Sequence, residues 1–132
     1  MLNFILLNGM RILLLIGAGG FIGSICRYLV QQFIQNKLVS TFPYGTLGVN
    51  ITGCFLIGLI LALSLKGYVT NDWRLFLVTG ICGGYTTFSA FSMESVALFR
   101  SGEMLSGFTY IAGSVLLGLL ATFAGIWFTK LF

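Results

Sequence analysis

Four long apolar runs, separated by short polar connections, dominate the pattern of the chain. A helix needs roughly 20 residues to cross the hydrocarbon core of a bilayer, and the last three runs meet this length directly. The first does so once it continues past Arg27 to Ile34. The uncharged runs are Ile12–Cys26, Tyr44–Leu65, Leu75–Met93 and Met104–Thr129. We therefore predict an all-α membrane protein: a single domain over residues 1–132, with four transmembrane helices at approximately 11–34, 44–65, 73–99 and 104–130.

The third run differs from the others because Gly80–Glu94 combines glycines, hydroxyls, aromatic rings and a carboxylate. Gly83 and Gly84, followed by Thr86 and Thr87, form a weak helix-forming sequence, so we predict a break near the middle of this helix. A break at mid-membrane frees backbone carbonyls, and such backbone normally persists only where it lines a cavity or an ion path. We expect the functional site in this segment.

The composition supports a membrane protein and excludes a water-soluble domain. Charged residues make up 8% of the chain, and its mean hydropathy is +1.03. A soluble protein of this size needs a charged surface, and the connections are too short to hold a separate soluble domain. Met1–Asn8 is apolar, but Arg11 follows this stretch instead of preceding it, which argues against a signal peptide.

The seven basic residues are scattered over the predicted helix ends. They form no patch, so they indicate membrane-edge anchors and no nucleic-acid partner. Four spans place both termini at one membrane face. That face carries Arg11, Lys66, Arg74 and Lys130, and the opposite face carries Arg27, Lys37 and Arg100. Two topologies remain open: one weakly biased orientation, or insertion in both orientations with pairing as an antiparallel dimer.

A four-helix chain of this size has little interior of its own, which favours a homo-oligomer. The spacings Gly19-x-x-x-Gly23 and Gly80-x-x-x-Gly84 offer small-residue faces for close helix contact. The three cysteines are solitary and predict packing residues, with no disulfide framework or metal site. Histidine is absent and acids are few, so no nucleophile–base pair is available and we do not expect an enzyme.

Several polar and aromatic residues within the runs each allow two interpretations. Asn50 shares a helix face with Gly53 and either bonds another helix or donates to an anion in a pore. Phe88 and Phe91 share a face, and either pack or turn their positive ring edges toward an anion. Ser89 and Ser92 are potential donors beside these rings.

The remaining candidates are equally open. In the fourth run, Tyr110, Ser114 and Gly118 form a small and polar stripe, which either bonds its own helix or provides a row of donors for an ion. Arg27 is either an interfacial anchor or a cation at a water-filled vestibule. Glu94 is either a membrane-edge carboxylate paired with a basic residue, or a proton or cation site.

Three motifs, in order along the chain, resemble the Fluc/CrcB family of fluoride channels. They are Gly19-Gly-x-x-Gly-x-x-x-Arg27-Tyr28, Tyr44-Gly-Thr-Leu-x-Val-Asn50-x-x-Gly53 and Gly83-Gly-x-Thr-Thr-Phe-Ser-x-Phe-Ser-x-Glu94. The resemblance covers nearly the entire chain. It implies a fluoride-selective channel that passively exports fluoride across a bacterial-type plasma membrane and so reduces cytoplasmic fluoride toxicity. It also implies an antiparallel, dual-topology homodimer.

The resemblance further assigns roles to individual residues. It implies a structural Na⁺ at the dimer centre, held by the backbone carbonyls of Gly83 and Thr86. Gly118 stands where a further hydroxyl is often found, and Tyr85 replaces the more usual aliphatic residue. The predicted fluoride pore comprises Asn50, Phe88, Phe91, Ser89, Ser92, Tyr110 and Ser114, with Arg27 and Glu94 at a vestibule or as anchors.

Two rival functions remain. A small proton-coupled multidrug exporter is also a four-helix antiparallel dimer, but it requires an acid deep within a helix, whereas Glu94 lies near a helix end. A membrane assembly subunit without transport activity requires only glycine faces for packing.

Overall fold

The computed structural model describes residues 2–38 and 40–131, and within them every element is helical. Four helical segments are long and apolar enough to cross a membrane, which supports the predicted multi-pass membrane protein. The elements are α1 (Leu2–Lys37), α2 (Tyr44–Leu65), α3 (Asn71–Arg74), the π-helix η1 (Leu75–Cys82), α4 (Gly83–Tyr85), α5 (Phe88–Arg100), α6 (Met104–Phe128) and the 3₁₀ turn η2 (Thr129–Leu131).

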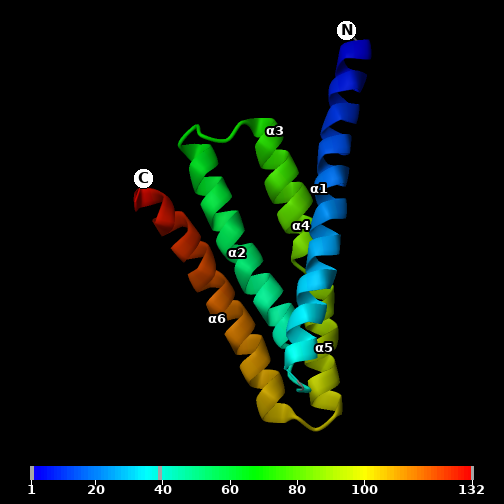
Figure 1. The fold of residues 1–132 in the computed structure, drawn as a ribbon, viewed down its shortest axis with the longest axis vertical. Helices are drawn as coiled ribbons and strands as arrows, with labels where there is room; N and C mark the ends of the chain where they lie inside the picture. The colour runs from blue at the N-terminus through cyan, green and yellow to red at the C-terminus, as the bar shows by residue number, and fades with distance from the viewer. Residues whose placement is uncertain (1, 39, 132) are drawn as a thin grey trace.

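Helix α1 is longer than the sequence pattern predicted. It begins at Leu2, ahead of the expected start near Arg11, because no proline or charged residue interrupts the preceding stretch. Its 36 residues correspond to about 54 Å at 1.5 Å per residue, against a hydrocarbon core of about 30 Å. The N-terminal turns of α1 therefore extend beyond the other helices (Figure 1).

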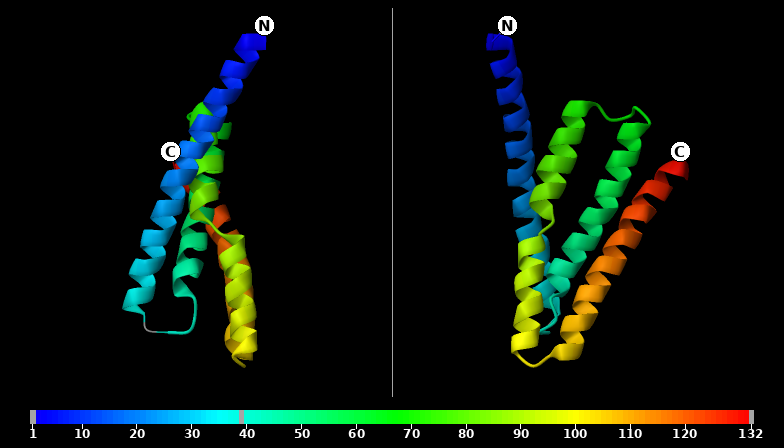
Figure 2. Two further views of the ribbon diagram at one scale, coloured as in Figure 1. Left: turned by 90° about the vertical axis from the view of Figure 1, so that its right-hand side faces the viewer. Right: turned by 180° about the vertical axis from the view of Figure 1, so that it is seen from behind.

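The third span consists of two halves joined by extended backbone. Helices α3, η1 and α4 form the first half, and α5 forms the second. Between them, Thr86 has φ −81° and ψ 156°, and Thr87 has φ −148° and ψ 118°. The chain thus leaves the helix at the threonine pair, while Gly83 and Gly84 remain in α4, because β-branched residues favour extended backbone. Figure 2 shows the change of direction at this point.

Glycines bring helix backbones into direct contact within the chain. Helix α1 packs on η1 and α4, and α2 runs along α6 (Figure 1). A Cβ at Gly80 would lie 2.8 Å from the Gly19 Cα, and one at Gly23 would lie 2.9 Å from the Tyr85 nitrogen. Gly84 likewise lies against α1. Both small-residue motifs are therefore used inside one chain, and they do not offer a free face to a second copy.

Both termini and the α2–α3 connection lie at one end of the molecule, as four spans require (Figure 1). At this end Arg11 pairs with Asp72, and Lys66 donates a hydrogen bond to the Thr129 carbonyl. Arg27 does not lie at the opposite edge, where the charge count placed it, because its guanidinium reaches the break in the third span. The basic residues at that opposite edge are therefore Lys37 and Arg100.

Candidate functional site

Helix α2 holds the break in the third span through Asn50. The Asn50 amide nitrogen donates to the Thr87 carbonyl at 3.1 Å, and the Thr87 N–H donates to the Asn50 Oδ1 at 2.9 Å. The Thr87 Oγ1 then accepts from the Ala90 N–H at 3.2 Å and so caps α5. The predicted interhelical hydrogen bond of Asn50 is therefore present. An Asn amide has two N–H hydrogens. The bond to Thr87 uses one of them and leaves the second available.

A cavity of about 270 Å³, which we call the break cavity, lies beside this contact. It brings together Asn50, Phe88, Phe91 and Ser114 from α2, α5 and α6. Among the described residues, the Ser114 Oγ is the buried side-chain oxygen that has no hydrogen-bond partner. Its hydroxyl hydrogen is available at the cavity wall. The cavity is lined by Asn50, Cys54, Ile57, Thr86, Thr87, Phe88, Phe91, Ser114 and Val115.

Aromatic rings continue from the break cavity into the protein. The ring centroids of Phe88 and Phe91 lie 5.6 Å apart, and those of Phe91 and Tyr110 lie 5.3 Å apart. Tyr110 is fully buried, and its hydroxyl donates to the Glu94 carboxylate at 2.7 Å. Thr46, which is also buried, donates to the other Glu94 oxygen at 2.7 Å. The carboxylate therefore orients two hydroxyls from two helices.

Glu94 faces a second cavity, of about 300 Å³, which we call the loop cavity. The break cavity, Phe91, Tyr110, Glu94 and the loop cavity form one succession of contacts. The hydrogen-bond partners of Glu94 are hydroxyls, so the structure does not show the pairing with a basic residue that was one of its two interpretations. The loop cavity is lined by Thr41, Pro43, Glu94, Ala97, Leu98 and Ser101.

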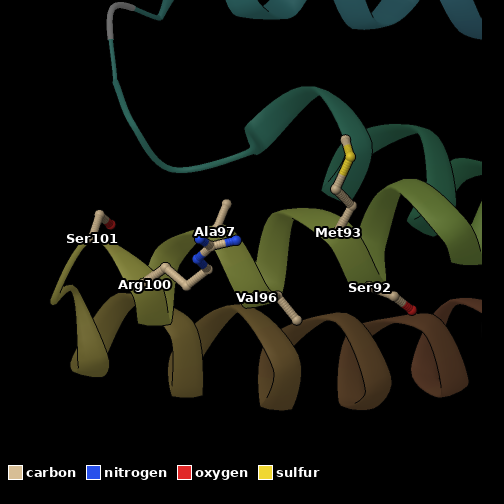
Figure 3. A pocket seen from close by; sticks show the side chains of 6 residues that line it. All are labelled: Ser92, Met93, Val96, Ala97, Arg100 and Ser101. Carbon is tan, nitrogen blue, oxygen red and sulfur yellow. The ribbon is translucent and has the colours of Figure 1, made fainter.

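Ser89 and Ser92 do not line the break cavity. Ser89 is exposed, and its Oγ lies 3.3 Å from the Thr87 Oγ1. The Ser92 hydroxyl donates to the Phe88 carbonyl of its own helix at 2.9 Å. Ser92 borders a separate open groove of about 760 Å³ along α5, together with Arg100 (Figure 3). The structure thus separates these two serines from the other predicted pore residues.

Two carbonyls at the break have lost the donors of an uninterrupted helix. The Thr87 N–H, which would pair with Gly83, donates to Asn50, and the Ala90 N–H, which would pair with Thr86, donates to the Thr87 side chain. The Thr86 carbonyl instead accepts a hydrogen bond from the Arg27 Nη1 at 3.4 Å. Carbonyl oxygens suit hard cations, so Gly83 and Thr86 fit the donor type that Na⁺ requires. Within residues 2–38 and 40–131, no three His, Cys, Asp or Glu side chains could hold a metal ion.

Comparison with known proteins identifies the family. Residues 14–126 match the family described as CrcB-like protein, Camphor Resistance (CrcB). The chain belongs to the CrcB family. The match reaches from α1 to α6 and therefore includes both cavities and the break.

Relatives of this CrcB chain carry the name fluoride-specific ion channel FluC. The protein from Phocaeicola vulgatus is 50% identical over 121 residues, covering 92% of this chain and all of the relative. The protein from Rhizobium meliloti is 48% identical over 118 residues, covering 89% of this chain and 94% of the relative. The protein from Thermus thermophilus is 46% identical over 117 residues, covering 89% and 92% of the two chains.

Asn50 was identified as an amide within an apolar helix, but two neighbours of Asn50 on α2 were missed. Thr46 is bonded to Glu94, and Cys54 lines the break cavity. They lie four residues before and four residues after Asn50, and residues four apart share a helix face. Extending the polar face around Asn50 by one turn in each direction would have identified both.

Proposed function

We propose that this CrcB-family protein is a subunit of a fluoride-selective channel, which passively exports fluoride across the plasma membrane. Membership of the family and the similarity to relatives named fluoride-specific ion channel support this function. The structural observation that carries the proposal is the break cavity, where an amide, a free hydroxyl and two phenyl rings from three helices meet.

The lining of the break cavity suits a small anion that must lose water. Moving a bare ion into a medium of low dielectric constant costs on the order of tens of kcal/mol, so fluoride needs successive replacements for its hydration shell. The second amide hydrogen of Asn50, the Ser114 hydroxyl and the positive ring edges of Phe88 and Phe91 can provide them. Neutral donors bind less tightly than a fixed cation, and moderate binding allows the ion to leave.

The same geometry weighs against a proton-coupled drug exporter. Such a protein needs an available acid facing a cavity that accepts a drug-sized molecule. Glu94 already accepts hydrogen bonds from Thr46 and Tyr110.

Passive efflux from liposomes tests the channel function. Purified protein is reconstituted into liposomes loaded with fluoride or with chloride, in the absence of a proton gradient. We expect rapid release of fluoride, detected with a fluoride electrode, and little release of chloride. If fluoride stays inside under these conditions, the channel function is wrong. Release that requires an imposed proton gradient would indicate the exporter.

Replacing the aromatic residues tests their role in the path. We expect Phe91→Ile to lower fluoride efflux at least about tenfold, because a ring edge that stabilises the anion by about 1.4 kcal/mol corresponds to that factor. Phe88→Ile should act in the same direction. Phe21→Ile is the matched control, since Phe21 is exposed on α1. Unchanged efflux in both test variants would remove these phenylalanines from the path.

The assembled protein is, in our proposal, an antiparallel homodimer that binds a structural Na⁺ at the Gly83 and Thr86 carbonyls. One chain offers two carbonyl oxygens, fewer than hard cations take, so equivalent carbonyls of a second copy would complete the site. Gly83 is exposed on the surface of the single chain, where a copy could approach. When bound, the ion would supply positive charge that links the two subunits.

Replacing sodium tests both the ion and the dimer. We expect light scattering to give the mass of a dimer in sodium buffer, and we expect its melting temperature to fall when N-methylglucamine replaces sodium. Tyr68, which is exposed in the α2–α3 connection, offers a site for a cysteine label that reports which side of the membrane each copy faces, once the three native cysteines are replaced by alanine. A monomer in both buffers, or labelling from one side alone, would overturn the proposed assembly.

A further inference from the structure

Tyr85 is the last residue of α4 before the extended backbone of the break. Its hydroxyl lies 3.0 Å from the Thr52 Oγ1 on α2. Its ring lies over Gly53, where an added Cβ would come within 3.3 Å of the Tyr85 Cδ1. The side chain thus spans from the end of α4 to the neighbouring helix at two points.

The direction of the Tyr85–Thr52 hydrogen bond follows from the other contacts of Thr52. The Thr52 hydroxyl donates to the Gly48 carbonyl at 2.8 Å and lies 3.1 Å from the Val49 carbonyl. A hydroxyl has one hydrogen, so Thr52 is the acceptor and Tyr85 is the donor. Among the described residues, Thr52 is the hydrogen-bond partner of the Tyr85 hydroxyl, so removal of the Thr52 hydroxyl takes away this acceptor.

One stretch of α2 therefore contacts the third span on both sides of the break at Thr86 and Thr87. Asn50 fixes Thr87 on the α5 side through two hydrogen bonds, and Thr52 fixes Tyr85 on the α4 side. We propose that Tyr85 is a positioning residue for the ion path, and that its bond to Thr52 fixes where the third span leaves the helix. As far as it concerns fluoride, this inference rests on the proposed function.

The experiment is a double-mutant cycle of fluoride efflux, measured per folded channel, with Tyr85→Phe, Thr52→Val and the double variant. Tyr85→Phe removes one interhelical hydrogen bond, so we expect efflux about threefold lower. Thr52→Val leaves the Tyr85 donor unsatisfied, so we expect efflux about tenfold lower. The double variant should recover to the rate of Tyr85→Phe, because it contains no unsatisfied hydroxyl. This recovery distinguishes positioning from a general loss of stability.

The chain offers a matched control for each substitution. Thr109 is exposed on α6 and bonds the carbonyls of Leu105 and Ser106, as Thr52 does on α2, but has no tyrosine partner. Tyr28 is an exposed tyrosine on α1. We expect Thr109→Val and Tyr28→Phe to conduct as the wild type does.

The outcomes separate this inference from the proposed function. If the wild-type protein releases no fluoride, the proposed function fails. If the wild type conducts, two results would show that the positioning role of Tyr85 is wrong. One is equal fluoride efflux from Thr52→Val and Thr109→Val. The other is a double variant whose efflux does not recover to that of Tyr85→Phe. Should Thr52→Val yield no folded protein, the comparison of Tyr85→Phe with Tyr28→Phe decides, and equal efflux in these two overturns the inference.

Discussion

The two halves of the third span are held in opposite ways. The first half packs on α1 backbone to backbone through residues 75–85. Gly19 lies against Gly80, Gly20 against Gly84, and Gly23 against Tyr85. The second half, α5, is positioned by side chains, through Asn50 at its start and Glu94 farther along. Backbone packing holds the first half, whose last residue, Tyr85, also bonds Thr52. Side-chain hydrogen bonds hold the second half.

This difference indicates how each half responds to substitution. A backbone contact has no room for an added methyl group, so the first half is sensitive to volume. A hydrogen-bonded contact tolerates volume more readily but depends on each donor and acceptor. The predicted ion path lies along the second half, where Phe88 remains 78% exposed on the single chain. The half that packs backbone to backbone thus adjoins the half along which the ion path is predicted to lie.

The largest effect should come from Gly80→Ala in the first half. The added Cβ would lie 2.8 Å from the Gly19 Cα, and overpacking of this kind costs about 1–3 kcal/mol, occasionally more. We expect a lower melting temperature and less folded protein, measured by thermal denaturation in detergent. Gly20→Ala is the control, because nothing lies within 4 Å of its added Cβ. Equal stability of the two variants would contradict backbone contact between these helices.

Asn50→Ala tests the second half and should have an effect of comparable size. It leaves the N–H and the carbonyl of Thr87 without their partner, and each unsatisfied group costs about 1–3 kcal/mol. We expect fluoride efflux at least about tenfold lower in liposomes. Asn36→Ala, at an exposed site on α1, should leave efflux unchanged. Wild-type efflux from Asn50→Ala would show that α5 is held by other contacts.

Glu94→Gln should have a moderate effect on efflux. An amide has one accepting oxygen, so either Thr46 or Tyr110 loses its acceptor, and we expect efflux about threefold lower. Glu103→Gln is a close control, because Glu103 also accepts from two hydroxyls, those of Thr41 and Ser106, but lies in the α5–α6 connection. If the two variants behave alike in the efflux assay, Glu94 has no special place on the path.

Asp72→Asn should have the smallest effect. It removes the ion pair with Arg11 at the start of the third span, where the side chains are 60% and 40% exposed. Exposed ion pairs contribute about 0–1 kcal/mol, so we expect a small change in melting temperature and unchanged efflux. A loss of efflux similar to that of Asn50→Ala would show that the first half is held by charge as well as by shape.

Hydrophobic patterning was enough to predict the four spans, because bilayer thickness constrains span length. The region of the break was predicted from the glycine and threonine pairs, and threonine favours extended backbone. The gathering of Asn50, Phe91 and Ser114 at one cavity agrees with the predicted set of path residues, whose function stays a prediction. The π-helical turns of η1, which pack against α1, were not predicted. Ser89 does not line the break cavity, because it lies two residues from Phe91 and residues two apart do not share a helix face, and its role in the path stays a prediction.

The break at Thr86 and Thr87 has one more electrostatic consequence. It divides one helix dipole into two, so the C-terminal end of the first half, with its partial negative charge, meets the N-terminal end of α5, with its partial positive charge. Each end corresponds to about half an elementary charge. These charges belong to peptide groups, so no change of pH titrates them and no side-chain substitution deletes them. Only a continuous helix through residues 86–87 would abolish them.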